Sequence, residues 1–332
     1  MNSDITVALL LGGTSEEKEV SKNSGNSILT ALRSLNYKVK VIDPAYGLNQ
    51  PKDENKYFEE KDYASRTNRN YIDVINSPLF DDVDVAFLAL HGKWGEDGTI
   101  QSLLEFRGIK YTGSKILASS LAMDKSMTKI MFQHAGVETP KWFIIEKNII
   151  NHSFVQKNIK EKFGYPAVIK PNDEGSTIGL TICKNESEVP AAIEKAANCS
   201  KKILVEEYIP GRELTVAILD QKALPVLEIK PKSGFYDYEN KYTSGRTDYI
   251  VPADIPNQVS EHLQKQAVMA FDSIGCESYA RIDFRLTDEY KFYCLEVNTL
   301  PGMTSTSLVP KMAKAAGISF EELIDRIIKN SF

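Results

Sequence analysis

Two predicted strands near the C-terminal end of the chain gather side chains that could do chemistry on one face. The strands span residues 279–286 and 292–298 and are joined by a short turn. Side chains alternate between the two faces of a strand, so Leu295 and Val297 should share the face opposite the polar residues. The polar face then carries one guanidinium, two carboxylates and one amide: Arg281, Asp283, Glu296 and Asn298.

Such a set of oxygen donors is typical of a site for a hard divalent cation. Mg²⁺ in phosphoryl-transfer sites takes one or two carboxylates and completes its shell with phosphates and water. The same strand spacing also fits a solvated sheet face with ordinary salt bridges. The next loop, residues 299–307 with the sequence TLPGMTSTS, favours the metal-phosphate reading because its backbone N–H groups could face an anion.

A lysine stands at the end of another predicted strand, residues 167–170, and the small-residue loop PNDEGSTIG follows it. The ammonium of Lys170 and the loop N–H groups could together hold phosphates. The pattern is not a P-loop, because the lysine precedes the glycines. A surface lysine that extends its ammonium into water is the alternative interpretation of Lys170.

Two glycine-rich loops follow predicted strands in the first third of the chain: GGTSEEKEVS at residues 12–21 and HGKWGEDG at residues 91–98. Neither contains G-x-G-x-x-G, and the first is acidic, so a dinucleotide-binding dehydrogenase is disfavoured. Glu17 is better suited to hold an ammonium, and a charged His91 could hold a carboxylate. The pair could clasp an amino acid, although His91 alone also fits a hydrogen-bonded structural histidine.

The segment 235–242, FYDYENKY, is aromatic and charged and follows no clean period. Flanking glycines at positions 234 and 245 make this composition suitable for a lid over a site. A rim loop whose tyrosines cover neighbouring apolar surface is the alternative.

Strands and helices must position these residues, and in the first third of the chain they follow an α/β pattern. Continuous apolar strands are predicted at residues 6–11, 39–42 and 83–90, with a helix over 20–35. This order predicts a parallel sheet. The polar stretch 45–76 between the second and third strands is interpreted as a surface excursion with little structure of its own.

A helix should begin near Met123 and end at Gly136, since glycine suits the left-handed position after a helix and Pro140 follows. The pattern then changes to α+β. Short strands are predicted at residues 142–145, 167–170, 180–183 and 203–207, and one helix at residues 191–197. Two closing helices are predicted at 308–316 and 320–328. We place domain boundaries at 1–120, 121–210 and 211–332.

Composition limits the function classes. The chain has 332 residues, 42% of them apolar, and 40 Lys and Arg against 45 Asp and Glu, which gives a net charge of −5. A globular protein of two or three domains is predicted. No basic excess exists to attract nucleic acid, and no leader or membrane span is predicted. Four cysteines without C-x-x-C spacing suit a reducing cytoplasm.

Taken together, these motifs resemble those of the D-alanine-D-alanine ligases, which have the ATP-grasp fold. The resemblance covers residues 12–310 in family order and rests on GGTSEEKEVS, HGKWGEDGT, YTGS, MDK, KPNDEGSTIG, FYDYENKY, RIDF and LEVNTLPGMTSTSLVP. It implies an N-terminal Rossmann-like parallel-sheet domain followed by a two-lobed ATP-grasp fold. Thr177 stands where a serine is usual, Thr306 where a histidine is common, and the stretch 45–76 is longer than in short members.

The resemblance also implies residue roles. For ATP these are phosphate contacts from Lys125 and Lys170, an adenine site of Glu206, Glu207, Tyr208 and Ile209, and a ribose contact from Glu213. For two Mg²⁺ ions, which Mn²⁺ could replace, the ligands are Asp283, Glu296 and Asn298. For the first D-alanine they are Glu17, Ser176, Tyr242 and His91, and for the second Ser307 and Leu308. Lys241 would reach the γ-phosphate, and Arg281 with the Gly302 N–H would stabilise the oxyanion.

The implied activity is the ATP-dependent ligation of two D-alanine molecules through a D-alanyl phosphate, for peptidoglycan precursor synthesis in the cytoplasm. The resemblance further suggests a homodimer with no nucleic acid or membrane partner. Two alternatives stay open: a D-alanine-D-lactate ligase, for which Tyr242 is the discriminating residue, and a non-catalytic nucleotide or amino-acid sensor on the same fold. The retained set of metal-ligand candidates favours an enzyme.

Overall fold

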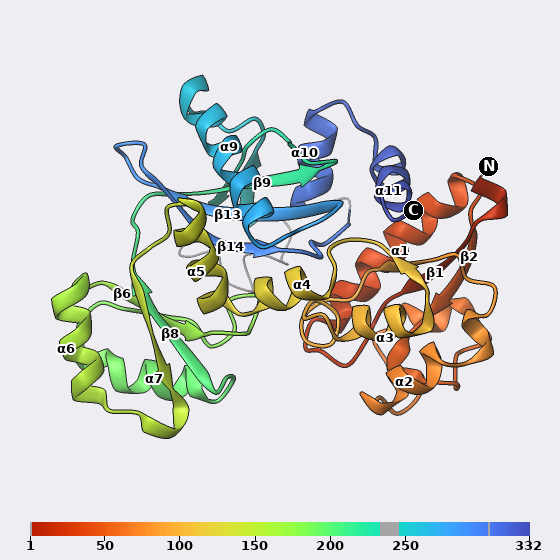
Figure 1. Ribbon diagram of the computed structural model, residues 1–332, viewed down its shortest axis with the longest axis horizontal. Coiled ribbons are helices and arrows are strands. Elements are labelled where there is room, and N and C mark those ends of the chain that lie inside the picture. The colour runs from red at the N-terminus through yellow and green to blue at the C-terminus, as the bar shows by residue number, and fades with distance from the viewer. Residues whose placement is uncertain (1, 233–245, 305) are drawn as a thin grey trace.

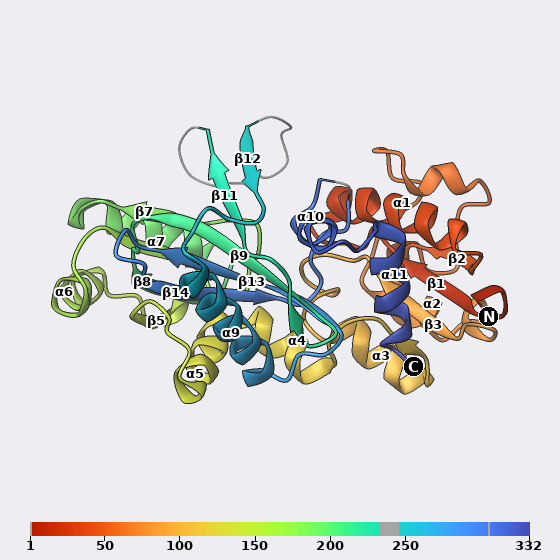
Figure 2. The ribbon, with the colours of Figure 1, turned by 90° about the horizontal axis from the view of Figure 1, so that it is seen from above.

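The computed structural model describes residues 2–232, 246–304 and 306–332, and it contains three β-sheets, each with its own helical cover (Figures 1 and 2). The predicted α/β and α+β fold class is confirmed. Among the residues described, none of the helices combines the length and apolar character needed to cross a lipid bilayer.

The N-terminal sheet is parallel, with strand order β2-β1-β3-β4. Its strands are β1 (Thr6–Leu10), β2 (Lys38–Ile42), β3 (Val85–Leu88) and β4 (Lys110–Tyr111), and its helices are α1 (Lys18–Ser34), α2 (Arg69–Ile75) and α3 (Thr99–Arg107). The next helix, α4 (Ile116–Met123), packs its buried alanines, Ala118 and Ala122, into a separate core with Phe271 and Ile282. Residues of β1 and β3 are buried throughout, as expected for parallel strands covered on both faces. The functional loops follow the carboxyl ends of β1 and β3, where parallel sheets of this kind present their sites.

The polar stretch 45–76 is more ordered than its composition predicted. It contains most of the short 3₁₀ helix Pro44–Tyr46, the 3₁₀ helix Glu54–Tyr57 and all of α2, and another 3₁₀ helix, Pro78–Phe80, follows. Tyr46, Tyr57 and Tyr71 are all buried against the N-terminal unit. The interpretation of this stretch as a surface excursion with little structure was therefore wrong. The pattern did not reveal the order, because single tyrosines among charged residues leave no periodic signal.

The central sheet is antiparallel, with order β5-β8-β6-β7. It consists of β5 (Trp142–Glu146), β6 (Ala167–Pro171), β7 (Thr181–Cys183) and β8 (Lys202–Glu207), and its helices are α6 (His152–Lys162) and α7 (Val189–Ala197), with 3₁₀ turns at Lys147–Ile149 and Glu186–Glu188. Val155 and Ile159 of α6 and Ile193 of α7 share one core with the sheet, at the lower left of Figure 1. Helix α5 (Lys125–Ala135) precedes this unit and ends at Gly136, whose φ of 74° confirms the predicted stop.

The third sheet runs β12-β11-β9-β13-β14, with β10 paired to β9. Its strands are β9 (Arg212–Leu219), β10 (Lys222–Ala223), β11 (Leu227–Pro231), β12 (Thr247–Ile250), β13 (Tyr279–Leu286) and β14 (Phe292–Asn298), and α9 (Asn257–Ser273) packs on it. The register steps from Asp283 opposite Glu296 to Phe284 opposite Cys294, which leaves Leu295 as an extra residue. Leu295 therefore lies outside the buried core that holds Cys294 and Val297, and the predicted alternation is interrupted at this residue.

The closing helices are α10 (Leu308–Ala315) and α11 (Phe320–Lys329), near their predicted positions. Leu323 and Ile327 of α11 are fully buried in the same cluster as Ile28 and Leu32 of α1. Both views show α11 beside the N-terminal unit (Figures 1 and 2). The end of the chain thus returns to its beginning, while the three domain boundaries stay a prediction.

Candidate active site

A cavity of about 450 Å³ lies where the three sheets approach one another. Its size is typical of a small-molecule site. Residues from all three units line it, including the loops after β1, β3 and β6 and the strand pair β13–β14. The predicted site residues on its wall are Glu17, His91, Lys125, Lys170, Ser176, Glu213, Arg281, Asp283, Glu296, Asn298, Gly302, Ser307 and Leu308.

Other predicted site residues do not line this cavity. Four of them form the end of β8 and the residues after it: Glu206, Glu207, Tyr208 and Ile209. Glu206 is buried behind Lys170, and the backbone carbonyl of Ile209 accepts a hydrogen bond from Arg285 Nε at 3.2 Å. Lys241 and Tyr242, with the rest of the predicted lid 235–242, lie outside the described residues.

The strand pair holds its charged groups in a compact arrangement. Asp283 stands opposite Glu296, and Arg281 stands opposite Asn298. Arg281 donates to both oxygens of Asp283, with Nε–Oδ1 at 2.9 Å and Nη2–Oδ2 at 2.8 Å. Thr215 on β9 donates from Oγ1 to Asp283 Oδ1 at 2.6 Å. Asp283 is therefore held in place by two neighbouring groups, the Arg281 guanidinium and the Thr215 hydroxyl.

The donor set fits a divalent cation that also binds phosphate. Among residues 2–232, 246–304 and 306–332, no three His, Cys, Asp or Glu side chains come close enough to hold a metal by themselves. Asp283 and Glu296 supply carboxylate oxygens, and the adjacent Asn298 supplies an amide oxygen that already accepts from Leu300 N at 3.0 Å. Mg²⁺ suits such an incomplete oxygen set, because it takes its remaining ligands from phosphates and water.

A buried cluster of three charges lies behind the cavity wall. Glu206 Oε1 is 2.5 Å from Lys170 Nζ, and its Oε2 is 3.0 Å from Lys129 Nζ. Lys129 is fully buried and also donates to Thr139 Oγ1 at 2.7 Å. Burial alone would raise the pKa of Glu206, but the charges of Lys129 and Lys170 outweigh it and lower that pKa. Glu206 thus holds the Lys170 side chain in place at the cavity wall.

The sequence analysis missed Lys129, although a signal for it exists. Lys125 and Lys129 are four residues apart on α5, and positions i and i+4 share one helix face. Both are buried, which is rare for lysine without a partner. Lys125 reaches the other carboxylate, with Nζ 3.4 Å from Glu296 Oε2, and donates to the Glu174 carbonyl at 2.7 Å.

On the opposite wall, Glu17 and the loop after β6 meet. Ser176 Oγ donates to Glu17 Oε1, and a Cβ on Gly175 would come within 3.3 Å of Glu17 Oε2. Ser176 and Thr177 have φ values of 49° and 66°, in the left-handed region that residues other than glycine rarely adopt. Loop strain of this kind occurs mainly where a surrounding site imposes it.

His91 is buried beside the same wall. Its Nδ1 lies 3.2 Å from Glu96 Oε1, and its Nε2 lies 3.3 Å from Ser24 Oγ on α1. Burial lowers the pKa of His91, but the bond to Glu96 and the charges of Glu96 and Glu17 outweigh it and raise that pKa. The imidazole is therefore favoured as a cation that could attract a carboxylate.

The loop after β14 closes the far end of the cavity. Ser307 Oγ accepts from Thr304 N at 2.9 Å, and Met303 N donates to Ser24 Oγ at 3.2 Å. A Cβ on Gly302 would lie 3.1 Å from Ser307 Oγ, so the backbone approaches the side chain closely there. Ser307 precedes the first residue of α10, and helix starts of this kind present N–H groups to anions.

Three further wall or support residues were missed. Arg285 lines the cavity and lies 3.6 Å from Glu213 Oε2 through Nη1. The alternation that predicted Arg281 and Asp283 extends to Arg285, so the signal was present. Glu96 and Ser24, which orient His91, come from two separate segments, and only the tertiary structure brings them together.

Known proteins resemble this chain over most of its length. Family models described as the D-ala D-ala ligase N-terminus and C-terminus match residues 6–114 and 131–329. The chain is 44% identical over 322 residues to a D-alanine-D-alanine ligase from Syntrophotalea carbinolica, a match that covers 97% of this chain and 94% of the relative.

Solved structures of similar proteins cover nearly the full length. The ligase of Bacillus anthracis complexed with ATP has a TM-score of 0.78 and 34% identity, and the match covers 98% of this chain and 96% of that one. The VanG D-Ala:D-Ser ligase of Enterococcus faecalis has a TM-score of 0.82 and 29% identity, with 99% of each chain covered. The predicted family is therefore confirmed: the chain belongs to the D-alanine-D-alanine ligase family.

Proposed function

We propose that this protein joins two D-alanine molecules into D-alanyl-D-alanine at the expense of ATP, for peptidoglycan precursor synthesis. One observation carries the proposal. A single cavity places the strand-borne carboxylates and amide near buried lysines on one side and the Glu17–Ser176 pair on the other. The first group suits a metal-bound triphosphate, and the second suits the ammonium group of an amino acid.

For ATP, we assign Lys125 and Lys170 to the phosphates. Both side chains are buried at the cavity wall, and a carboxylate holds each ammonium group in place. Glu213 would meet the ribose, and the adenine would lie against the segment from Glu206 through Glu207 and Tyr208 to Ile209. Glu206, the first residue of this segment, contacts Lys170, and this contact supports an adenine site beside the proposed phosphate site.

For the metal, we assign Asp283, Glu296 and Asn298 as ligands of two Mg²⁺ ions, which Mn²⁺ could replace. When bound, the ions would offset the charge of the triphosphate and polarise its γ-phosphoryl group. Arg281, which now donates to both oxygens of Asp283, would then be able to turn toward the reacting carboxyl group.

For the amino acids, Glu17 would accept the ammonium of the first D-alanine, with Ser176 and Tyr242 completing its hydrogen-bonded group. His91 would attract the carboxylate. Ser307 and Leu308, at the start of α10, would hold the second D-alanine. Lys241 would reach the γ-phosphate from the predicted lid.

The reaction follows from these positions in two steps. The carboxylate of the first D-alanine attacks the γ-phosphorus, which forms D-alanyl phosphate and releases ADP. The free amine of the second D-alanine then attacks the acyl carbon, and the tetrahedral intermediate loses phosphate and a proton. Arg281 and the Gly302 N–H would stabilise its oxyanion, a contact that typically lowers such a barrier by about 3 to 4 kcal/mol.

The proposal includes a cytoplasmic location, where ATP is available, and a homodimer as the assembly. A D-alanine-D-lactate ligase is the second candidate, and the likeness to a D-Ala:D-Ser ligase makes the second acceptor the point to test. A non-catalytic sensor is the third. These candidates differ in product, so one experiment separates them.

The experiment incubates the protein with ATP, Mg²⁺ and D-alanine, and then adds L-alanine, D-serine or D-lactate as the second substrate. Phosphate release and product mass are recorded. Rapid D-alanine-dependent phosphate release with D-alanyl-D-alanine as the main product is expected. A depsipeptide as the main product would favour the second candidate, and binding of ATP without phosphate release would favour the sensor.

A further inference from the structure

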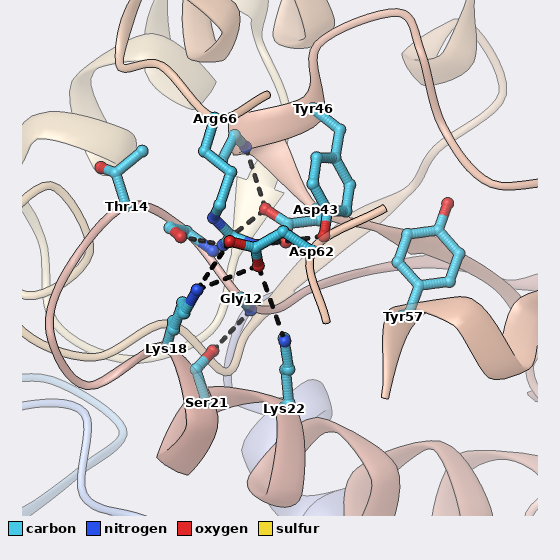
Figure 3. A network of polar contacts seen from close by, with 12 residues as sticks. Gly12, Thr14, Lys18, Ser21, Lys22, Asp43, Tyr46, Tyr57, Asp62 and Arg66 are labelled. Atoms are coloured by element: carbon cyan, nitrogen blue, oxygen red, sulfur yellow. Dashed lines mark hydrogen bonds and ion pairs between the residues drawn. The ribbon is translucent and has the colours of Figure 1, made fainter. Parts of the chain in front are cut away.

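A buried polar network, shown in Figure 3, lies next to the loop that carries Glu17. Asp43 directly follows β2 and is 1% exposed. Its Oδ1 accepts from Gly13 N at 3.0 Å and from Ala45 N at 2.9 Å. Its Oδ2 has no hydrogen-bond donor among the described residues but lies 3.1 Å from Arg66 Nη2. A buried carboxylate with this environment depends strongly on that one guanidinium.

Arg66 comes from the stretch 45–76 and reaches back to the loop. Its side chain is only 10% exposed. Nη2 donates to the carbonyl of Gly13, and Nη1 donates to Tyr46 Oη at 3.1 Å and to Asp62 Oδ1 at 3.0 Å. The guanidinium also lies over the Tyr46 ring, 5.0 Å from its centroid. The planar fork of arginine can make these contacts together, whereas lysine cannot.

Asp62, from the same stretch, holds the other end of the loop. Lys18, the first residue of α1, donates to both oxygens of Asp62 at 3.0 and 2.7 Å. Lys22, which is 1% exposed, lies 3.9 Å from Asp62 and donates to the Glu59 carbonyl at 2.7 Å. Lys18 is the residue directly after Glu17, so the Asp62 contact restrains the chain immediately beside Glu17.

The middle of the loop is held as well. Thr14 N donates to Tyr71 Oη at 3.1 Å, and Thr14 Oγ1 donates to Asn68 Oδ1. Gly12 and Gly13 have φ values of 78° and 79°, and a Cβ on Gly12 would lie 2.0 Å from Asp43 Oδ2. The loop therefore needs glycines, and glycines give it conformational freedom that outside contacts must restrict.

We propose that Arg66 and Asp62 are positioning residues that hold the loop 12–18, and thereby fix the Glu17 carboxylate for the ammonium group of the amino acid that enters the cavity. Neither residue lines the cavity, so each acts through the loop. The inference rests on the proposed function for the identity of the amino acid. It assigns a role to the stretch 45–76, which supplies Asp62, Arg66, Asn68 and Tyr71.

The test compares Arg66→Lys and Asp62→Asn with a matched control, Arg33→Ala. Arg66→Lys keeps a positive charge near Asp43 and loses the fork, and Asp62 is one-third exposed, so its substitution is compatible with folding. Arg33 of α1 pairs with Glu54 of the same stretch at 2.7 Å but is exposed and does not contact the loop. The control therefore removes a contact to the stretch without touching the loop.

Each variant is measured in two ways. In steady-state kinetics, we expect the KM for D-alanine to rise about tenfold in Arg66→Lys and Asp62→Asn, with kcat and the KM for ATP within about twofold of wild type. By hydrogen–deuterium exchange without substrate, we expect the amides of Gly13 and Thr14 to exchange at least about tenfold faster. Arg33→Ala should match wild type in both measurements.

Unchanged exchange over residues 12–18 in both test variants would overturn the inference. Faster exchange with an unchanged KM for D-alanine would also overturn it, as would a fall in kcat with both KM values unchanged, which indicates a merely structural role. A wild-type protein without D-alanine-dependent phosphate release would refute the proposed function instead. The exchange measurement would still decide whether Arg66 and Asp62 hold the loop.

Discussion

Substitution of the buried Lys129 tests whether charge balance organises the nucleotide side of the cavity. With both lysines protonated, Lys129, Lys170 and Glu206 form a cluster with a net charge of one positive unit, and the Lys129 side chain is 0% exposed. Burial lowers the pKa of Lys129, against the opposing charge of Glu206. Lys129→Met leaves the cluster neutral, whereas Glu206→Gln leaves two cations without their carboxylate. Breaking a buried ion pair costs about 3 to 5 kcal/mol.

The expected magnitudes follow from what each variant leaves behind. Lys129→Met should lose about 2 to 3 kcal/mol of the free energy of unfolding, because Lys170 still compensates Glu206 and methionine fills most of the space. Glu206→Gln should lose more, about 3 to 5 kcal/mol, although glutamine is nearly isosteric. In Lys129→Met the KM for ATP should also rise about tenfold, since the phosphates meet one positive charge fewer.

The assay is urea unfolding followed by tryptophan fluorescence. Trp142 on β5 pairs directly with Glu206 on β8, so it reports on the sheet that holds the cluster. A Trp94→Phe background leaves Trp142 as the only tryptophan. The matched control is Lys157→Met. Lys157 Nζ lies 3.8 Å from Glu161 Oε1 in an exposed ion pair, so this substitution should lower the free energy of unfolding by less than about 0.5 kcal/mol.

The ranking of the variants decides the matter. If loss of packing dominated, removal of the lysine would be worse than the conservative change at Glu206. The charge-balance reasoning would be refuted by a Lys129→Met variant with a lower free energy of unfolding than the Glu206→Gln variant. A loss below about 1 kcal/mol in both variants would refute it as well.

Three further outcomes are expected. Glu296→Gln should abolish D-alanine-dependent phosphate release from ATP, because it removes a proposed metal-ligand carboxylate; wild-type rates in a phosphate-release assay would contradict the metal assignment. Burial raises the pKa of Asp43 to about 6, against the opposing charge of Arg66, so its contribution to stability is full below about pH 4 and is lost as the pH rises through 6. The wild-type protein should therefore lose about 3 kcal/mol of its free energy of unfolding between pH 4 and pH 7, as measured by urea unfolding, and Asp43→Asn should remove this loss. A variant that keeps the wild-type dependence on pH would show that another group is responsible. Tyr242→Phe should increase the yield of depsipeptide relative to dipeptide when D-lactate competes with D-alanine; a product ratio unchanged from wild type at every pH measured would rule out this role for Tyr242.

Local patterns were sufficient for much of the fold. Strands β1, β2 and β3 of the first sheet, the stop of α5 at Gly136 and the two closing helices follow from apolar runs and from backbone preferences of single residues, whereas the two-residue strand β4 was not predicted. The alternation along β13 likewise placed Arg281 and Asp283 on one face, where they meet at hydrogen-bond distance. The motifs, which occur in family order over most of the chain, also predicted the family, and the comparisons confirm this prediction.

Other features depend on contacts that no local pattern encodes. The extra residue Leu295 arises from the pairing of β14 with β13, so a strict alternation could not predict it. The stretch 45–76 looked like an unstructured excursion because its buried tyrosines are isolated among charged residues.

By itself, the sequence determined which residue types are available, which strands and helices present them, and to which family the chain belongs, because each of these depends on neighbours along the chain. Only the tertiary structure decided that Lys129 meets Glu206, that Arg66 meets Asp43 and the Gly13 carbonyl, and that α11 returns to α1. These pairs are far apart in sequence. Their energies come from burial and from charges brought close together, and both exist only after the chain has folded.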